Sequence, residues 1–121
     1  MAEYLPVNTP GQALVSSASA SITGGQLLAV SGSGTVAPAG AATQAWVGVA
    51  AFDVASGDLV TVYAGGVQEL TASGAITAGA AVVSGAAGTV ASSATPAAAT
   101  QVGVALTTAA DGAKVRVKLA R

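Results

Sequence analysis

Residues 47–62 read VGVAAFDVASGDLVTV, and 55 positions further on residues 102–117 read VGVALTTAADGAKVRV. The shared positions include the initial Val-Gly-Val-Ala, a central glycine and two valines spaced two apart. Upstream, Ile22-Thr23-Gly24-Gly25 returns as Ile76-Thr77-Ala78-Gly79, and Gly34-Thr35-Val36-Ala37 returns as Gly88-Thr89-Val90-Ala91, both displaced by 54. Turn glycines and β-branched residues are the types that shape a sheet. The sequence therefore predicts two related β units, at about residues 22–64 and 76–119, and nothing in the repeat resembles a chemical site.

Composition limits the fold and argues against several functions. Hydrophobic residues make up 52% of the 121 residues, but many are alanine, so a core buries little area per residue. Part of the stability should therefore come from association with further copies or with a larger assembly. Charged residues make up 7% and the net charge is −1, which argues against a nucleic-acid partner, since phosphate binding needs clustered Lys and Arg. Without His or Cys, the chain lacks the commonest general base and any thiolate metal ligand.

The hydropathy of the chain does not indicate a membrane partner. Its mean hydropathy is +0.68, and no charge falls between Glu69 and Asp111. Glycines and Pro96 interrupt that stretch, however, so it holds no run of about 18 strongly apolar residues. The first ten residues also lack the basic region and apolar stretch of a signal peptide.

Short apolar runs separated by glycine-rich breaks predict an all-β domain over residues 12–121. Residues 1–11 are predicted to form an extended N-terminal arm, because Pro6 and Pro10 hold Tyr4, Leu5 and Val7 outside the repeat. We expect this arm to lie against another chain, where an extended segment can add a strand to a neighbouring sheet. The predicted strands are Ala13–Ser17, Ser19–Thr23, Gln26–Ser31, Gly34–Ala37, Ala45–Phe52, Leu59–Ala64, Val67–Thr71, Ala81–Ser84, Thr89–Ser92, Gln101–Thr107 and Ala113–Leu119.

The last of these strands alternates strictly between basic and apolar residues. Lys114, Arg116 and Lys118 should face solvent while the residues between them face a core. With Arg121 they are all the basic residues of the chain, gathered in its final eight positions. One interpretation is an edge strand that cations protect from aggregation. The other is a contact stripe for an acidic surface on a partner subunit.

A search for chemical sites finds weak signals only. Gly32-Ser33-Gly34-Thr35-Val36-Ala37 has the spacing of a dinucleotide fingerprint, but no helix can follow through Pro38 and Gly40, so a hairpin turn is favoured. Asp53 and Asp58 could meet across a turn, yet hard cations recruit more oxygens than two carboxylates supply. Serines and threonines lack a base that would activate them. We therefore expect neither an enzyme nor a cofactor or metal site.

The few aromatic residues cluster around one predicted hairpin. Phe52 is expected at the centre of the core and Tyr63 is expected to be partly exposed. Trp46 fits either the core or an interface anchor, because Trp is enriched in binding hot spots and its counterpart in the second unit is the polar Gln101.

Taken in order, several segments resemble the small Ala/Gly/Val-rich capsid decoration, or cement, proteins of tailed bacteriophages. They cover about the last two-thirds of the chain: Val47-Gly48-Val49-Ala50, Ala55-Ser56-Gly57-Asp58-Leu59-Val60-Thr61-Val62, Gly66-Val67-Gln68-Glu69-Leu70, Ile76-Thr77-Ala78-Gly79-Ala80-Ala81-Val82, Val102-Gly103-Val104-Ala105 and Gly112-Ala113-Lys114-Val115-Arg116-Val117-Lys118-Leu119. The resemblance implies a β-rich protein without catalytic residues that binds the outside of the expanded capsid as a trimer.

The prediction is thus an all-β fold, a compact β-barrel or β-sandwich built from two related halves with an extended N-terminal arm. Its function would be that of a trimeric decoration protein on the outer capsid surface, made in the host cytoplasm, with the major capsid protein and its own copies as partners. Candidate partner-contact residues are Tyr4, Leu5, Val7, Trp46, Lys114, Arg116 and Lys118. The alternatives are another virion or cell-surface module, such as a tail, fibre or adhesin domain, and a β module that binds a small ligand or glycan.

Overall fold

The computed structural model describes Tyr4, Val7 and residues 12–121. Within these residues the chain forms β-strands and one short 3₁₀ helix, with no α-helix and hence no helix able to cross a membrane. The all-β class predicted from the alternating patterns is confirmed. The elements are β1 (Leu14–Ala18), β2 (Leu27–Gly32), β3 (Thr35–Pro38), β4 (Trp46–Ala50), β5 (Leu59–Tyr63), β6 (Val67–Thr71), β7 (Ala81–Ser84), η1 (Ala86–Gly88), β8 (Val90–Ser92), β9 (Gln101–Ala105) and β10 (Lys114–Leu119).

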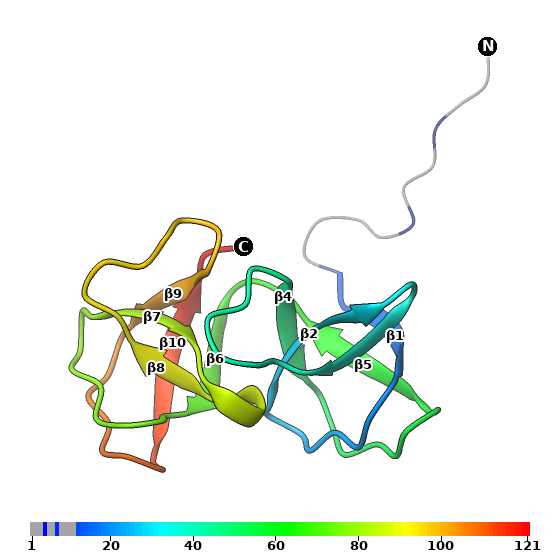
Figure 1. Cartoon of the computed structure of the whole chain (residues 1–121), viewed down its shortest axis with the longest axis horizontal. Coiled ribbons are helices and arrows are strands. Elements are labelled where there is room, and N and C mark those ends of the chain that lie inside the picture. The colour runs from blue at the N-terminus through cyan, green and yellow to red at the C-terminus, as the bar shows by residue number, and fades with distance from the viewer. Residues whose placement is uncertain (1–3, 5–6, 8–11) are drawn as a thin grey trace.

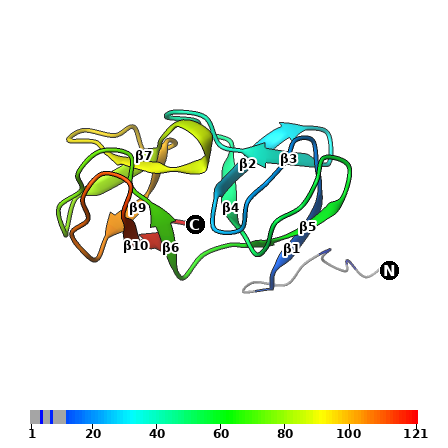
Figure 2. The same cartoon turned by 90° about the horizontal axis from the view of Figure 1, so that it is seen from below.

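Two lobes lie side by side, β1 to β5 in one and β6 to β10 in the other (Figures 1 and 2). We call them the first half, residues 12–65, and the second half, residues 66–121. The first half is a closed barrel in the order β1-β3-β2-β4-β5, in which a parallel pairing of β1 with β3 and an antiparallel pairing of β1 with β5 complete the ring.

The second half repeats this pairing order. Its sheet runs β6-β10-β9-β7-β8. Read around the ring in the opposite direction, the first barrel runs β1-β5-β4-β2-β3, which is the same order with each strand replaced by its counterpart. The closing contact is reduced to one parallel bridge, Ala72 with Val90, at the positions of Ala18 and Val36 in the first half. The shared order follows from shared turns and strand patterns at offsets of 54 and 55 residues.

Backbone hydrogen bonds outside the strands repeat as well. The amide of Gly25 donates to the carbonyl of Ala50 at 2.9 Å, and that of Gly79 donates to Ala105 at 2.7 Å. The turn glycines behave alike, since Gly57 donates to Ala18 and Gly112 donates to Ala72. Both of these glycines have positive φ angles, +94° and +80°, which L-residues with a side chain rarely adopt.

Each half also contains the same β-bulge. The register of β4 against β2 shifts just before Gly48, and that of β9 against β7 shifts just before Gly103. At both glycines the neighbouring strand lies against the backbone, so a Cβ would clash with the carbonyl of Tyr63 or of Lys118. Bulges and strand glycines let a sheet bend tightly. The Val-Gly-Val-Ala sequence therefore marks the bend that curves each sheet.

The core divides into two clusters. The inside of the first barrel is small and made of Ala18, Ile22, Leu28, Val36, Ala50, Val60 and Val62. The second, larger cluster fills the second half and continues into the junction between the halves. Leu27, Ala29, Trp46 and Val49 belong to it, so the outward side chains of β2 and β4 are buried by the second half. The core is thus shared between the barrel of the first half and the sheet of the second half, which pack against each other.

Four sequence-based expectations are corrected by the structure. Ser19–Thr23 is not a strand, and only Ile22 makes an isolated bridge, to Val54. Phe52 lies in a bend and is 48% exposed, because the strand β4 ends before it and its side chain leaves the alternating face. The last strand, β10, is not an edge strand, since it pairs with both β6 and β9. Of the two roles considered for Trp46, the interface anchor is wrong, because its side chain is buried with 1% exposure.

Candidate partner-binding surfaces

The basic residues of β10 lie on an exposed face of the second half. Val115, Val117 and Leu119 are buried, and the three cations between them are exposed, as the alternation predicts. Arg116 approaches Glu69 of β6 at 3.7 Å, and both side chains are more than 60% exposed. An ion pair of this exposure contributes little to folding, so the cations remain available to a partner.

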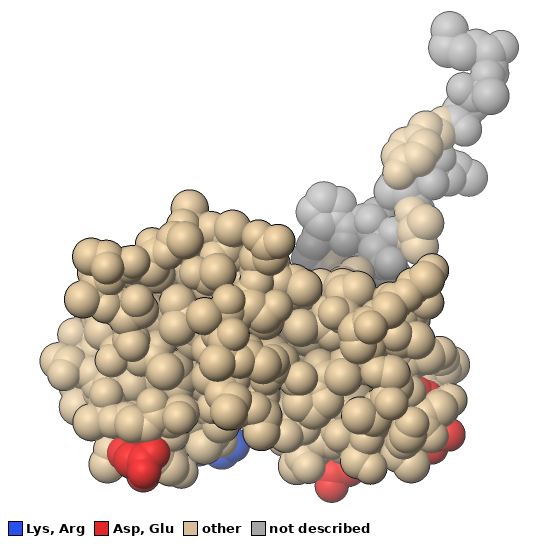
Figure 3. All heavy atoms as spheres, in the orientation of Figure 1, with Lys and Arg blue, Asp and Glu red and all other residues tan. Residues whose placement is uncertain are grey.

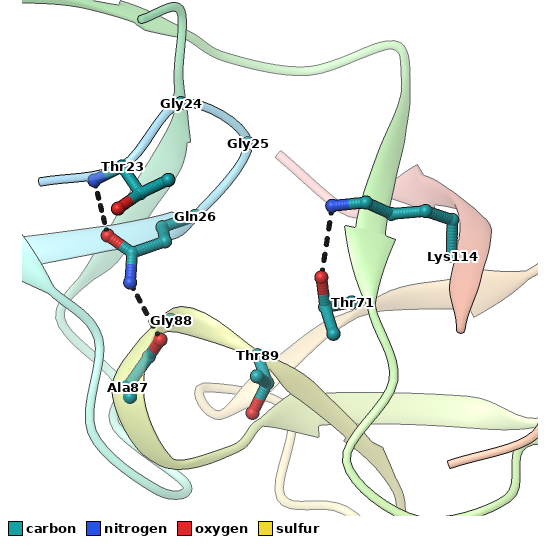
Figure 4. Close-up of a pocket in the computed structure, with 9 residues that line it drawn as sticks. All are labelled: Thr23, Gly24, Gly25, Gln26, Thr71, Ala87, Gly88, Thr89 and Lys114. Carbon is teal, nitrogen blue, oxygen red and sulfur yellow. Dashed lines mark hydrogen bonds between the residues drawn. The ribbon is translucent and has the colours of Figure 1, made fainter. Parts of the chain in front are cut away.

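Lys114 stands at a cleft between the two halves (Figure 4). Its Nζ donates to Oγ1 of Thr71 at 3.0 Å, and the opposite wall is the Gly24-Gly25 turn with Gln26. Backbone amides that could cradle a phosphate are already bonded, because Gly24 donates to Oδ1 of Asp53, Gly25 to Ala50 and Gly88 to Ala39. The cleft thus offers a cation and hydroxyl groups, without the converging amides of an anion nest.

Asp53 has a structural role at this turn. Its Oδ1 accepts the Gly24 amide at 2.7 Å, and at the equivalent place in the second half Oγ1 of Thr108 accepts the amide of Ala78 at 3.0 Å. In the described part of the chain, no group of three or more acidic, His or Cys residues is placed to hold a metal.

The equivalent face of the first half carries no charge. Across β1 and β5 the outward side chains are Val15, Ser17, Leu59, Thr61 and Tyr63, which we call the apolar face. Val15 is 61% exposed and Leu59 63% exposed, unusually open positions for side chains of this kind. The corresponding residues of β6 and β10, at offsets of 54 and 55, are Glu69, Thr71, Lys114, Arg116 and Lys118, which we call the charged face.

The two faces have the same strand register. Val15 pairs with Thr61 and Ser17 with Leu59, just as Glu69 pairs with Arg116 and Thr71 with Lys114. Reading along the chain singled out the charged face but missed the apolar one. The repeat nevertheless indicates the apolar face, because Leu59, Thr61 and Tyr63 align with the three cations of β10. The same strand positions thus carry uncharged side chains in one half and cations in the other.

Charged side chains are few over the whole surface. In the view of Figure 3 they gather along the lower part of the molecule, and the other described residues visible on that side are uncharged. Such a surface suits association with protein, because the centres of protein interfaces are depleted in charged residues.

The remaining aromatic candidate joins the two halves instead of facing a partner. The guanidinium of Arg121 lies 4.3 Å from the centroid of the Trp46 ring and donates to the carbonyls of Gln44 at 2.7 Å and Trp46 at 3.0 Å. The indole Nε1 itself has no hydrogen-bond partner among the described residues. Trp46 therefore acts as a core residue that a cation from the second half covers.

The N-terminal candidates are only partly covered by the structure. Tyr4 is 85% exposed and Val7 is 94% exposed. Leu5 and the rest of residues 1–11 lie outside the described residues, so the arm stays a prediction.

Residues 8–119 match the phage cement protein family, which is nearly the whole chain. The chain belongs to that family. The resemblance drawn from its Val-Gly-Val-Ala repeats and closing strand is thus confirmed, and the protein is a phage structural protein associated with the virion.

The fold is shared with a solved phage protein. The structure of the head fibre gp8.5 N base of bacteriophage phi29 superposes with a TM-score of 0.73 at 24% identity, covering 90% of this chain and 93% of that one. At this identity the match concerns the fold alone. No curated protein matches the chain.

Proposed function

We propose that this cement-family chain is a head decoration protein that binds the outer surface of the mature capsid as a trimer and stabilises the shell. The observation that carries the proposal is the family match across residues 8–119, which covers both halves. The surface supports it, since exposed apolar residues and one cationic strand suit protein partners. We propose a structural and not a catalytic role, because the matching family is one of phage cement proteins.

The mechanism would be thermodynamic. A protein that binds only the expanded lattice stabilises that lattice by mass action, by about 2.7 kcal/mol per site when its free concentration is a hundred times its Kd. If each bound copy bridges neighbouring subunits of the major capsid protein, this binding energy stabilises the contacts between subunits that the internal pressure would otherwise separate. The proposed partner contacts, with the shell or with a sister copy, are Tyr4, Leu5 and Val7 of the N-terminal segment and the cations Lys114, Arg116 and Lys118.

The test uses phage heads that lack the protein, in expanded and unexpanded form. Purified chain should co-sediment with expanded heads only, raise the temperature at which they release DNA, and give density for three copies around one position in a cryo-EM map. Saturable binding to neither form of head would overturn the proposal. A truncation starting at Gln12 should fold with an unchanged melting curve but bind heads more weakly. Unchanged affinity would remove the arm from the contact.

A second candidate is the base of a projecting fibre. The shared fold with a phage head fibre base favours it. The same map separates the two, because a fibre base would carry density that extends outward beyond the β-domains.

A further inference from the structure

The two equivalent faces differ in a way that folding does not require. The charged face shows that these strand positions accept Lys, Arg and Glu while the sheet keeps the same register and pairing order. At the same positions the apolar face has Leu59, Thr61 and Tyr63 on β5, opposite Val15 on β1. Leaving such side chains open to water brings no folding energy, so their presence indicates a surface that something covers.

The charges of the chain are divided between the halves. Residues 12–65 contain two carboxylates, Asp53 and Asp58, and no Lys or Arg, which gives −2. Residues 66–121 contain four cations and two carboxylates, which gives +2. Two copies that meet first half to second half therefore attract each other, whereas copies that meet through like halves repel. This complementarity points to a second copy of the chain as the occupant.

The charged face also has apolar surface to offer. Lys118 pairs with Val67 of β6 on one side and with Val104 of β9 on the other, so two aliphatic side chains flank this cation. Val67 is half exposed and Val104 is 39% exposed. Lys and Arg stems can lie along an apolar partner surface while their heads reach its rim. On the partner that rim includes the exposed Asp58, which directly precedes Leu59.

The chain already contains one contact of this type. Arg121, from the second half, covers the ring of Trp46 in the first half at 4.3 Å. A cation of the charged face could cover the half-exposed ring of Tyr63 on a neighbouring copy in the same manner.

We propose that the apolar face of one copy docks on the charged face of the next, so that the copies associate head to tail. Contacts between two different faces generate a ring when the rotation closes, and three copies would form the trimer of the proposed function. The inference rests on the self-association part of that function. Since the two faces belong to different halves, one copy can present both at once.

The experiment transplants one face onto the other. The variant Leu59→Lys/Thr61→Arg/Tyr63→Lys places in β5 the residues that β10 carries at equivalent positions. Because the second half folds with these residues, we expect the first half to accept them too. The matched control, Ala94→Lys/Thr95→Arg/Ala97→Lys, adds the same charge at exposed positions between β8 and β9. A third protein adds Lys114→Glu/Arg116→Glu/Lys118→Glu to the first variant, which places opposite charges on the two faces of the proposed contact.

Analytical ultracentrifugation of all four proteins, with circular dichroism melts as the folding check, gives the outcome. We expect self-association to weaken by about a hundredfold or more in the face variant, to be unchanged in the control, and to return in the third protein. Rising salt should weaken the wild-type association. A folded face variant that still assembles would overturn the proposal, and so would failure of the third protein to assemble.

Head binding by the same proteins separates this inference from the proposed function. If the wild-type chain is monomeric both in solution and on heads but still decorates them, the head-to-tail contact is wrong and decoration stands. If the face variant assembles normally but no longer binds heads, the apolar face contacts the shell, and the proposal is overturned in favour of that occupant.

Discussion

Substituting Ala for Gly48 tests the bend that both halves share. A Cβ at this position would lie 2.8 Å from Cγ1 of Val62 and closer still to the carbonyl oxygen of Tyr63. In the second half a Cβ on Gly103 would lie 2.9 Å from the carbonyl carbon of Lys118 and 3.0 Å from Cγ1 of Val117. Because the obstacles include backbone, no rotamer change relieves them, and β4 or β9 must move away from its neighbour.

The magnitude follows from the cost of overpacking. Extra atoms in a packed core cost about 1–3 kcal/mol, and a clash with backbone belongs at the upper end of that range. For a chain of 121 residues, an unfolding entropy of about 2.1 cal/mol/K per residue converts about 3 kcal/mol into a melting temperature lowered by about 12 °C. Gly48→Ala and Gly103→Ala lie in different halves, so their effects should add to within about 0.5 kcal/mol.

Thermal unfolding followed by circular dichroism measures these shifts. Gly40→Ala is the matched control, because a Cβ there meets nothing within 4 Å and its φ is outside the left-handed region. Its melting temperature should stay the same or rise slightly, since Ala restricts the unfolded chain more than Gly does. If Gly48→Ala melts like Gly40→Ala, the close approach of β4 and β5 is not part of the native barrel and the account of the bend is wrong.

Three further substitutions separate core, turn and surface residues. Trp46→Ala should cost about 3–5 kcal/mol in a urea titration because it empties the junction, whereas Phe52→Ala, at a half-exposed side chain, should cost about 1 kcal/mol or less; equal losses would contradict the assignment of Trp46 to the core. Asp53→Ala should lower stability by about 1 kcal/mol through loss of the Gly24 amide bond, while Asp58→Ala serves as its control and should change stability little. Arg116→Ala should change the free energy of unfolding by less than about 1 kcal/mol at any salt concentration, and a larger loss would show that its pair with Glu69 is not the exposed contact described.

Local pattern was sufficient for most of the strands. The stretch from Lys114 to Leu119 alternates between basic and apolar residues, and alternate side chains on a strand point to opposite faces, so its buried and exposed residues were predicted correctly. Ser19–Thr23 was predicted as a strand and is not one, since a short apolar run next to a turn does not determine pairing. The offset of 54 to 55 residues was also readable, because turns and strands of one type recur in one order.

Residues whose burial depends on the other half could not be assigned from the sequence. Phe52 was expected in the core and is half exposed, while Trp46, which the sequence left open, is covered by Arg121 from the far end of the described chain. A charged strand suggested an edge, yet β10 has neighbours on both sides. Whether a strand lies at the edge or in the centre of a sheet depends on the other strands, so the residues of the strand alone do not determine it.

The clearest case is one valine in two copies of the same four residues. Val49 and Val104 both stand third in Val-Gly-Val-Ala, both follow the same bulge, and both point away from the interior of their own half. Val49 is 4% exposed and Val104 is 39% exposed. The sequence alone determined the strand, the bend and the side on which each valine points, because these depend on neighbours one to four residues away. Which of the two is buried was decided by tertiary structure, since the second half packs over Val49, whereas Val104 lies on a side of the second half that the described chain leaves open.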